Sequence, residues 1–431
     1  MKHNHFSSDL RIYITLYKVF SFSLVSIAVK FLVSFLLTKL FALLLGPSGI
    51  ALLGNLRSTM QILLSSSTLG MQQGIIRFTS EFKEQQDAFK KLTGTSHVIY
   101  GLTSVLVGAV LFFFSSHFAT VILQNVSYAW LFRALAFVVP LQGFHMLYFS
   151  ILQGLGNYKR VVWVELIMNV CNLAVVGFFT FRFGLSGALL ATVCVPAFYF
   201  FSSAFFLKSR VPSLKMAWSK GVAKNLFLYS LMTLFSGIAF PLLFILIRNH
   251  LSNILGIDAV GYWEAMNQFS YFYFILLNSI MLMYVLPKIT AQTSDGFYRL
   301  QVVEYFKKLM PLFALFLVSL FFMRKYAILV LFSSEFTAVE SLFGWQLLGD
   351  FFRALTLVLS VYFHARRMAT PYILIDMLLF LSLYAFTVFF VDEYGLVGAV
   401  KAHFISYLMY FLVTVFYLRK ILFNRNNLSN V

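Results

Sequence analysis

The chain has 431 residues, of which 60% are hydrophobic and only 11% are charged, and this composition excludes a soluble globular domain. It indicates an integral membrane protein. The formal net charge of +18 is spread over many short segments, which argues against a basic nucleic-acid-binding domain. Both cysteines, Cys171 and Cys194, lie in apolar segments, so we expect neither a disulfide framework nor a Cys-based metal site.

About 20 apolar residues span a bilayer as a helix, and on this measure the chain divides into twelve predicted spans. The first lacks a small-residue cleavage pattern at its end, so we expect a retained helix rather than a signal peptide. Gly- and Pro-containing segments separate several of the spans. The predicted limits are 20–45, 49–72, 97–119, 128–152, 161–181, 185–207, 222–247, 257–284, 305–323, 341–363, 371–391 and 395–418.

The distribution of Lys and Arg predicts the orientation of these spans, because basic residues are retained in cytoplasmic loops. Most of the 33 basic residues fall in segments on the same side as the N-terminus. The opposite side holds only Arg182, Arg248, Arg324 and Lys325. We therefore predict that the N- and C-termini are both cytoplasmic.

The two halves of the chain repeat a weak pattern. Glu165 lies five residues into the fifth span and Asp376 five into the eleventh, and the same offset places GLSGA at 184–188 on GLVGA at 395–399. Gly46, before the second span, likewise corresponds to Gly256, before the eighth.

This repeat predicts an all-α polytopic fold of two six-helix bundles, residues 1–210 and 211–431. Six helices return the chain to its starting side, so the bundles should be related by a pseudo-two-fold axis along the membrane normal. Transporters with this layout bind substrate between the halves, which points to alternating access.

Ionisable side chains inside the spans are candidates for a transport pathway, because charges are costly there. Basic residues outnumber acidic ones, which favours a cavity for an anionic or phosphate-bearing solute. The alternative for Lys39, Arg133 and Lys401 is that they reach the lipid headgroups from span ends. The basic residues are Lys30, Lys39, Arg57, Arg133, Arg353 and Lys401, and the acidic residues are Glu165, Glu264, Asp350 and Asp376.

Four of the basic residues are our candidates for the substrate cavity. Lys30 and Lys39 are about 180° apart around a helix, so they cannot both face it, and Lys30 is nearer mid-span. The predicted lining is Arg353, Arg57, Arg133 and Lys30. On the eighth span, Glu264, Gln268, Tyr271 and Asn278 form a polar stripe at helical spacing, which suits either a sugar ligand or an interhelical network.

Asp350 and Arg353 lie three residues apart, so they share one face of the tenth span. A purely structural ion pair would account for both charges. The alternative is that Asp350 orients Arg353 toward the cavity, where the guanidinium contacts a pyrophosphate or an acidic sugar.

The acids Glu165, Asp376 and Glu264 are candidates for energy coupling through a proton or a sodium ion. The alternative for the first two is pairing with Arg160, Arg366 or Arg367 at helix ends. The chain contains no GxxxxGK[ST], HExxH or GxSxG motif, so we expect no ATP hydrolysis, no bound metal or cofactor and no catalytic activity.

Three segments carry a family resemblance. They are LLGPSGIALLGNLRSTMQILLSSSTLGMQQGIIRFTSEF at 44–82, GIDAVGYWEAMNQFSYFYF at 256–274 and QLLGDFFRALTLVLSVYF at 346–363. They resemble Wzx-type O-antigen and lipid-linked oligosaccharide flippases of the multidrug/oligosaccharidyl-lipid/polysaccharide exporter superfamily.

The resemblance implies a bacterial inner-membrane protein of lipopolysaccharide or related polysaccharide biosynthesis. Such a protein moves undecaprenyl-pyrophosphate-linked oligosaccharide from the cytoplasmic to the periplasmic leaflet. Its expected partners are that lipid-linked glycan, membrane lipid and other glycan-assembly membrane proteins, with no nucleic acid.

Three alternatives stay open at this point. A drug/cation antiporter of the same superfamily would share the fold, but its cavity is expected to be acidic. A polytopic glycan polymerase or ligase usually carries a long periplasmic loop, and the longest external gap here, 324–340, is short. A passive scaffold or scramblase is the third alternative.

Overall fold

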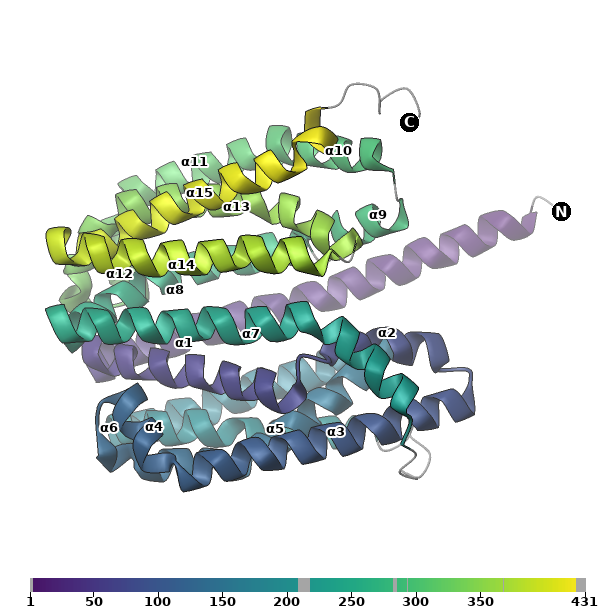
Figure 1. Cartoon of the computed structure of the whole chain (residues 1–431), viewed down its shortest axis with the longest axis horizontal. Helices are drawn as coiled ribbons and strands as arrows, with labels where there is room; N and C mark the ends of the chain where they lie inside the picture. Colours follow the sequence, from purple (N-terminus) through teal and green to yellow (C-terminus); the bar gives the residue numbers. More distant parts are fainter. Residues whose placement is uncertain (1–2, 208–217, 282–284, 293, 367, 424–431) are drawn as a thin grey trace. The chain divides into compact units, whose positions relative to one another are not determined.

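The computed structural model describes residues 3–207, 218–281, 285–292, 294–366 and 368–423. Within these ranges every regular element is helical, and all twelve predicted spans fall on helices, which confirms the all-α polytopic prediction (Figure 1). Many side chains exposed on the helix surfaces are Leu, Val and Phe, as expected for helices that face lipid.

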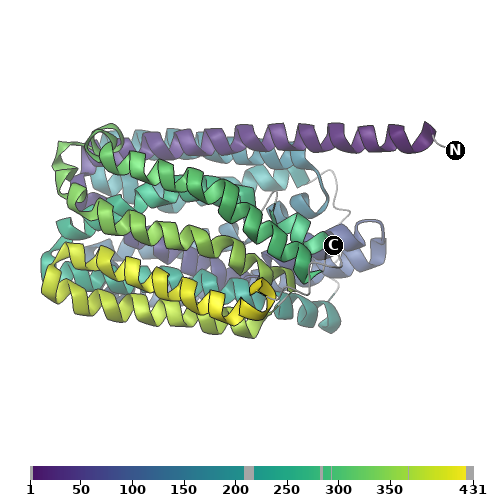
Figure 2. The same cartoon turned by 90° about the horizontal axis from the view of Figure 1, so that it is seen from above.

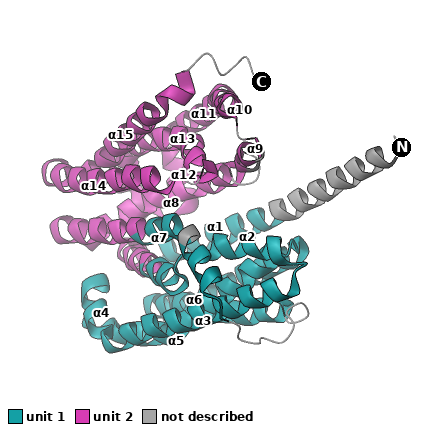
Figure 3. Cartoon of the chain, turned by 45° about the vertical axis from the view of Figure 1, so that its right-hand side comes forward, with its two compact units in different colours: residues 1–44, 59–238 teal, residues 45–58, 239–431 magenta. Residues whose placement is uncertain are grey.

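The described chain packs as two compact units (Figure 3). Unit 1 comprises residues 1–44 and 59–238, and unit 2 comprises residues 45–58 and 239–431. The predicted boundary between residues 210 and 211 lies outside the described residues. In the described chain, the last change from unit 1 to unit 2 falls inside helix α7, after residue 238, and the segment 45–58 of α1 also belongs to unit 2.

Unit 1 is built around helix α5, which packs against both α3 and α6. Its core includes Met71 just before α2, Ile75 of α2, Tyr100 of α3 and Leu147 of α5. Figure 2 shows the first part of α1 as a long straight rod. The helices that contribute to this unit are α1 (His3–Thr68), α2 (Gln72–Phe82), α3 (Gln86–Phe113), α4 (Ser115–Leu123), η1 (Val126–Tyr128), α5 (Ala129–Gly154), α6 (Tyr158–Leu207) and the first part of α7 (Lys220–Leu255).

Unit 2 is built around helix α15, which packs against α13 and α14. The helix α13 also contacts α8 and α11, so that α8, α13 and α15 are neighbours in this unit. After α7, the elements are α8 (Ile257–Ile280), α9 (Leu286–Ala291), α10 (Asp295–Glu304), a π turn η3 (Tyr305–Leu309), α11 (Met310–Phe322), α12 (Arg324–Leu331), η4 (Ser334–Leu342), α13 (Phe343–Arg366), α14 (Ala369–Tyr394) and α15 (Leu396–Phe423).

The sequence repeat reappears in the backbone. Gly184 and Gly395 have φ angles of 56° and 57°, and Gly46 and Gly256 have φ angles of 63° and 85°. Positive φ favours glycine because it has no Cβ. These four positions therefore turn the chain sharply between consecutive predicted spans, and α1 and α6 each contain two spans joined at such a turn.

Among the described residues, nine helices are long and apolar enough to cross a membrane. Since α1 and α6 each hold two predicted spans, these nine account for eleven of the twelve. The remaining span is α8, whose apolar residues are interrupted by Glu264, Asn267 and Gln268. This helix is therefore the most polar of the predicted spans.

The segment 45–58, at the start of the second half of α1, packs with unit 2. A Cβ atom on Gly261 would lie 2.1 Å from the Pro47 carbonyl oxygen, so the missing side chain permits this close approach to α8. The segment therefore brings Asn55, Arg57 and Ser58 into the same unit as α7 and α8.

Candidate functional site

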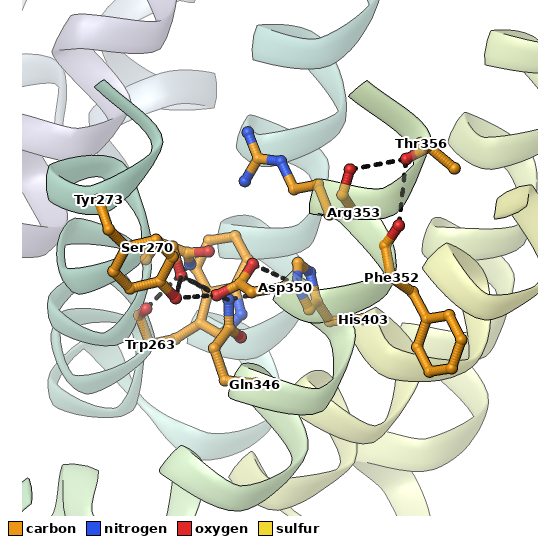
Figure 4. Close-up of polar contacts among 10 residues, drawn as sticks. Trp263, Ser270, Tyr273, Gln346, Asp350, Phe352, Arg353, Thr356 and His403 are labelled. Atoms are coloured by element: carbon orange, nitrogen blue, oxygen red, sulfur yellow. Dashed lines mark hydrogen bonds and ion pairs between the residues drawn. The ribbon is translucent and has the colours of Figure 1, made fainter. Parts of the chain in front are cut away.

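A buried carboxylate lies at the centre of the polar residues of unit 2 (Figure 4). Asp350 on α13 is 0% exposed. Its Oδ1 atom lies 3.1 Å from His403 Nε2 on α15, and because a carboxylate only accepts, the imidazole donates. Its Oδ2 atom accepts from Ser270 Oγ at 2.5 Å and from the Tyr273 hydroxyl, both on α8.

Gln346 completes this cluster one turn before Asp350 on α13. Its Nε2 atom lies 3.0 Å from Ser270 Oγ and 3.5 Å from Asp350 Oδ2. A buried charge is tolerated when hydrogen-bond donors surround it. Three helices, α8, α13 and α15, therefore share one polar centre inside an apolar unit, in which both carboxylate oxygens of Asp350 accept hydrogen bonds.

The position of His403 depends on a glycine. A Cβ atom on Gly349 would lie 2.3 Å from His403 Cδ2, so the ring occupies the space that a side chain at 349 would need. On its own helix the His403 ring packs against Tyr407, with ring centroids 4.7 Å apart. The histidine is thus held between α13 and the next turn of α15.

Arg353, one turn after Asp350, has different surroundings. Its guanidinium carbon lies 4.1 Å from the ring centroid of Phe274 and 5.6 Å from that of Tyr407. Arginine over an aromatic face is stabilised by the ring quadrupole. The side chain is half-buried, and in the described chain these two rings are its only direct partners.

Asp350 and Arg353 share one face of α13, but their side chains are not in direct contact. No hydrogen bond or ion pair joins the two side chains in the part of the chain that the structure describes, and Figure 4 shows the guanidinium pointing away from the carboxylate. Their charges are still close enough to attract each other. The reason is that donors from α8 and α15 already surround the carboxylate.

A second polar centre in unit 2 joins α7, α8 and the segment 45–58. Arg248 is 4% exposed and contacts Glu264 Oε2 through Nη2 at 2.8 Å and Nε at 3.0 Å. Its Nη1 donates to Ser58 Oγ at 2.9 Å. The seventh predicted span ends at 247, whereas α7 continues to Leu255 and buries Arg248. Glu264 is therefore paired with a buried arginine, and the sequence pattern did not predict this ion pair.

The polar stripe of α8 is accessible beyond this ion pair. Glu264 and Gln268 are partly exposed, and Tyr271 is 44% exposed. Arg57 is half-buried, and its charge interacts with those of Glu264 and Arg248. An accessible stripe of this kind on a membrane helix suits a polar environment better than lipid.

The predicted site residues of unit 1 form no comparable cluster among its described residues. Lys30 and Arg133 are exposed, and Arg133 Nε donates to Ser115 Oγ at 3.2 Å. Glu165 accepts a hydrogen bond from Ser26 of α1.

The acid of unit 2 that corresponds to Glu165 also has a hydroxyl partner. The Tyr410 hydroxyl donates to Asp376 Oδ1 at 2.8 Å. For the alternative partners of these acids, Arg160 donates to the Phe206 carbonyl at 2.8 Å and Arg366 to Asp295 at 3.2 Å. Arg367 lies outside the described residues.

Residues that the sequence patterns did not single out dominate the Asp350 centre. They are Ser270, Tyr273, Gln346, Gly349 and His403. A search for polar stripes on every span would have found some of them, because Gln346, Asp350 and Arg353 follow helical spacing, as do His403, Tyr407 and Tyr410.

The chemistry of these groups is binding chemistry. Within the described ranges, no three His, Cys, Asp or Glu side chains lie close enough together to hold a metal ion. Unit 2 offers a half-buried guanidinium, a polar stripe, the buried carboxylate of Asp350 and the partly exposed carboxylate of Glu264, which is paired with Arg248. This combination suits the recognition of a charged or hydroxyl-rich solute.

The chain matches known proteins in sequence. Residues 16–291 match the family model described as polysaccharide biosynthesis protein. The chain is 26% identical over 395 residues to proteins named lipid III flippase from Escherichia coli K12 and from Shigella flexneri. Each of these alignments covers 90% of this chain and 94% of the relative.

The fold is similar to that of solved membrane transporters. An inward-facing multidrug resistance MATE family transporter of the MOP superfamily aligns with a TM-score of 0.76 and 12% identity, covering 92% of this chain and 96% of that one. The lipid II flippase MurJ, in an inward closed conformation, aligns with a TM-score of 0.70 and 14% identity, covering 96% and 91%. These similarities confirm the fold.

Proposed function

Since the chain belongs to the polysaccharide biosynthesis protein family, we propose that it is a flippase for a lipid-linked oligosaccharide. Its substrate is an undecaprenyl-pyrophosphate-linked glycan, an O-antigen or related surface repeat unit. The protein moves this glycan from the cytoplasmic to the periplasmic leaflet of a bacterial inner membrane. The relatives named lipid III flippase, which align along nearly the whole chain, support this class of substrate.

The guanidinium of Arg353, which is half-buried beside aromatic rings and has no paired acid in the described chain, is the observation that carries the proposal. A glycan and a pyrophosphate cannot cross hydrocarbon without losing their hydrogen bonds to water, so a flippase must offer replacements. Arginine can bind a phosphate through two parallel hydrogen bonds. Arg353 has aromatic neighbours and no paired acid in the described chain, so its five N–H donors remain available.

The remaining candidates add polar and basic groups in each of the two units. Arg57 and the α8 stripe of Glu264, Gln268 and Tyr271 offer polar contacts to the glycan, and Lys30 and Arg133 are exposed basic groups of unit 1. The headgroup passes these groups while the polyprenyl tail stays in lipid. Alternating access of the two bundles moves it from one side to the other.

The topology proposed from the charge distribution has a direct test. With both termini cytoplasmic, single cysteines at exposed Ser127 and Asp392 react with an impermeant thiol reagent added to cells, in a background lacking Cys171 and Cys194. Cysteines at exposed Glu84 and Lys420 do not. The reverse labelling pattern would invert the proposed direction of transport.

Energy coupling is the next part of the proposal. Because the chain has no ATP-binding loop, one of Glu165, Asp376 and Glu264 exchanges a proton or a sodium ion during the cycle. The proton gradient and the sodium gradient are collapsed separately, and collapse of one of the two should reduce glycan translocation. Translocation that is indifferent to both gradients would remove the coupling role and favour passive scrambling.

A drug/cation antiporter is the second candidate, because a multidrug transporter has a TM-score of 0.76 to this chain. The two functions differ in the charge that the site must accept. A cationic drug needs an accessible acid, whereas Asp350 is buried and surrounded by donors and Glu264 is paired with Arg248. The accessible guanidinium favours an anionic substrate.

Purified protein in proteoliposomes with an undecaprenyl-pyrophosphate-linked oligosaccharide provides the decisive experiment. An impermeant glycosidase reports the fraction of glycan on each leaflet. The native protein should deliver glycan across the bilayer, and Arg353→Ala should abolish delivery. Arg353→Lys should restore part of it, because lysine keeps the charge but loses the bidentate contact.

Arg419→Ala is the matched control, since Arg419 is an exposed arginine that also contacts one phenylalanine ring. It should translocate glycan like the native protein. If Arg353→Ala also does so, Arg353 does not contact the substrate. If the native protein translocates a cationic dye but no glycan, the antiporter assignment replaces this one.

A further inference from the structure

We propose that His403 is a positioning residue that keeps Asp350 from pairing with Arg353, and so leaves the Arg353 guanidinium available to a phosphate-bearing headgroup. This inference rests on the proposed function. In this inference His403 determines which charged side chain of the site stays unpaired, and it does not contact the substrate.

The first step is that both carboxylate oxygens of Asp350 already accept hydrogen bonds. A carboxylate offers about four lone-pair sites. Ser270 and Tyr273 donate to Oδ2, and Gln346 Nε2 lies 3.5 Å from the same atom. Oδ1 has one hydrogen-bond donor in the described chain, which is His403 at 3.1 Å.

The second step is that Arg353 is the natural competitor for Oδ1. Two side chains three residues apart on a helix lie on the same face, and an Asp–Arg pair at this spacing is favourable. A carboxylate that is 0% exposed and lacks a partner on one oxygen gains greatly from recruiting a cation. Without His403, the Arg353 side chain should therefore turn from its aromatic neighbours toward Asp350.

The third step is that the chain is built to seat this histidine. Gly349 leaves the space into which the imidazole fits, and the ring lies 4.7 Å from Tyr407. Tyr407 is also one of the two rings beside the Arg353 guanidinium. Tyr407 thus packs against both His403, which donates to Asp350, and Arg353.

The availability of Arg353 can be measured by its reaction with phenylglyoxal in the full-length protein in proteoliposomes. Mass spectrometry follows the peptide that contains Arg353, with exposed Arg419 as the internal reference. The variants are His403→Leu, His403→Gln and the double variant Asp350→Asn/His403→Leu. Glycan translocation is measured on the same preparations.

We expect His403→Leu to slow the modification of Arg353 by about tenfold, the lower end for a hydrogen bond to a charged group. It should lose translocation to a similar extent. His403→Gln keeps a hydrogen-bond donor, so Arg353 should be modified at its native rate and glycan translocation should be retained. The double variant removes the carboxylate charge and should restore both the modification rate and translocation, although His403 is still absent.

A purely structural His403 makes a different prediction. In that case His403→Leu would lower protein yield or translocation while Arg353 reacts at its native rate, and that rate would overturn the proposal. Failure of the double variant to restore Arg353 reactivity would overturn it as well. If His403→Leu does not accumulate, His403→Phe replaces it, because phenylalanine keeps a ring beside Gly349 but has no hydrogen-bond donor, and Arg353 reacting at its native rate in that variant would overturn the proposal.

The outcomes separate this inference from the proposed function. Arg353→Ala that translocates glycan normally refutes the substrate contact itself. An essential Arg353 whose reactivity is independent of His403 refutes only the positioning role.

Discussion

Units 1 and 2 have similar turns but different polar interiors. Gly184 and Gly395, at matched positions of the repeat, have nearly equal φ angles, and a Cβ atom on Gly187 or Gly398 would lie 2.1 Å or 2.0 Å from a carbonyl oxygen of the preceding helix. Unit 2 nevertheless holds the Asp350 and Arg248 centres, and the described part of unit 1 holds no buried ion pair.

Several buried hydroxyls of unit 1 bond to the backbone of their own helices. Thr93, Ser104 and Thr180 each donate to a carbonyl four residues earlier. Such bonds satisfy the hydroxyl without linking helices. The difference indicates that the repeat preserves the turns, whereas the buried charge pairs of the described chain lie in unit 2.

The largest expected effect tests this asymmetry with one arginine from each unit. Arg248→Met leaves Glu264 without its buried partner and should cost about 3–5 kcal/mol of unfolding free energy. Arg133→Met removes an exposed arginine with one hydroxyl partner and should cost less than about 1 kcal/mol. Denaturant titration of the purified proteins in detergent micelles measures both.

The double variant Arg248→Met/Glu264→Gln is the control, because removing both charges should recover most of the lost stability. Equal losses for Arg248→Met and Arg133→Met would contradict the contrast between the two units.

An intermediate effect tests the shared backbone. Gly187→Ala and Gly398→Ala each place a Cβ against a carbonyl oxygen, of Phe179 and Phe390 respectively, and should each cost about 1–3 kcal/mol. The same denaturant titration measures them, with Gly221→Ala as a control because only one serine oxygen lies 4.0 Å away. Costs that differ strongly between the two units would show that the turns are not equivalent.

The smallest effect concerns two lysines outside the two polar centres of unit 2. Lys401 Nζ lies 3.3 Å from the ring centroid of Tyr394, so Lys401→Met should cost about 0.5–1 kcal/mol. Lys30→Met removes an exposed lysine and should change stability by less than about 0.5 kcal/mol. A larger loss for Lys30 would indicate a buried role in unit 1.

Much of the fold follows from the sequence. Apolar segments of about 20 residues predict the twelve spans, and the structure places a helix on each. The glycines of the repeat predict turns, and Gly46, Gly184, Gly256 and Gly395 all have positive φ. These features are local, because hydropathy and backbone strain depend on a residue and its chain neighbours.

The candidate site was only partly predictable. Helical spacing correctly places Asp350 and Arg353 on one face of α13 and allows them to pair, but in the described chain the hydrogen-bond partners of Asp350 are on α8, α13 and α15 and do not include Arg353. Spacing cannot show that Ser270 and Tyr273 of α8 approach the same carboxylate from another helix. Likewise, Arg248 lies beyond the end of an apolar segment, and only packing reveals that Glu264 is its partner.

The sequence by itself determines the class of protein, the number of spans, the internal repeat and the excess of basic groups within the spans. The tertiary structure alone decides which of those charges are paired. The reason is that helical periodicity relates residues within one helix, whereas a buried charge takes the best donor from any helix that packs against it. His403 reaches Asp350 from α15 through the space left by Gly349, and Arg353 remains without an acidic partner in the described chain.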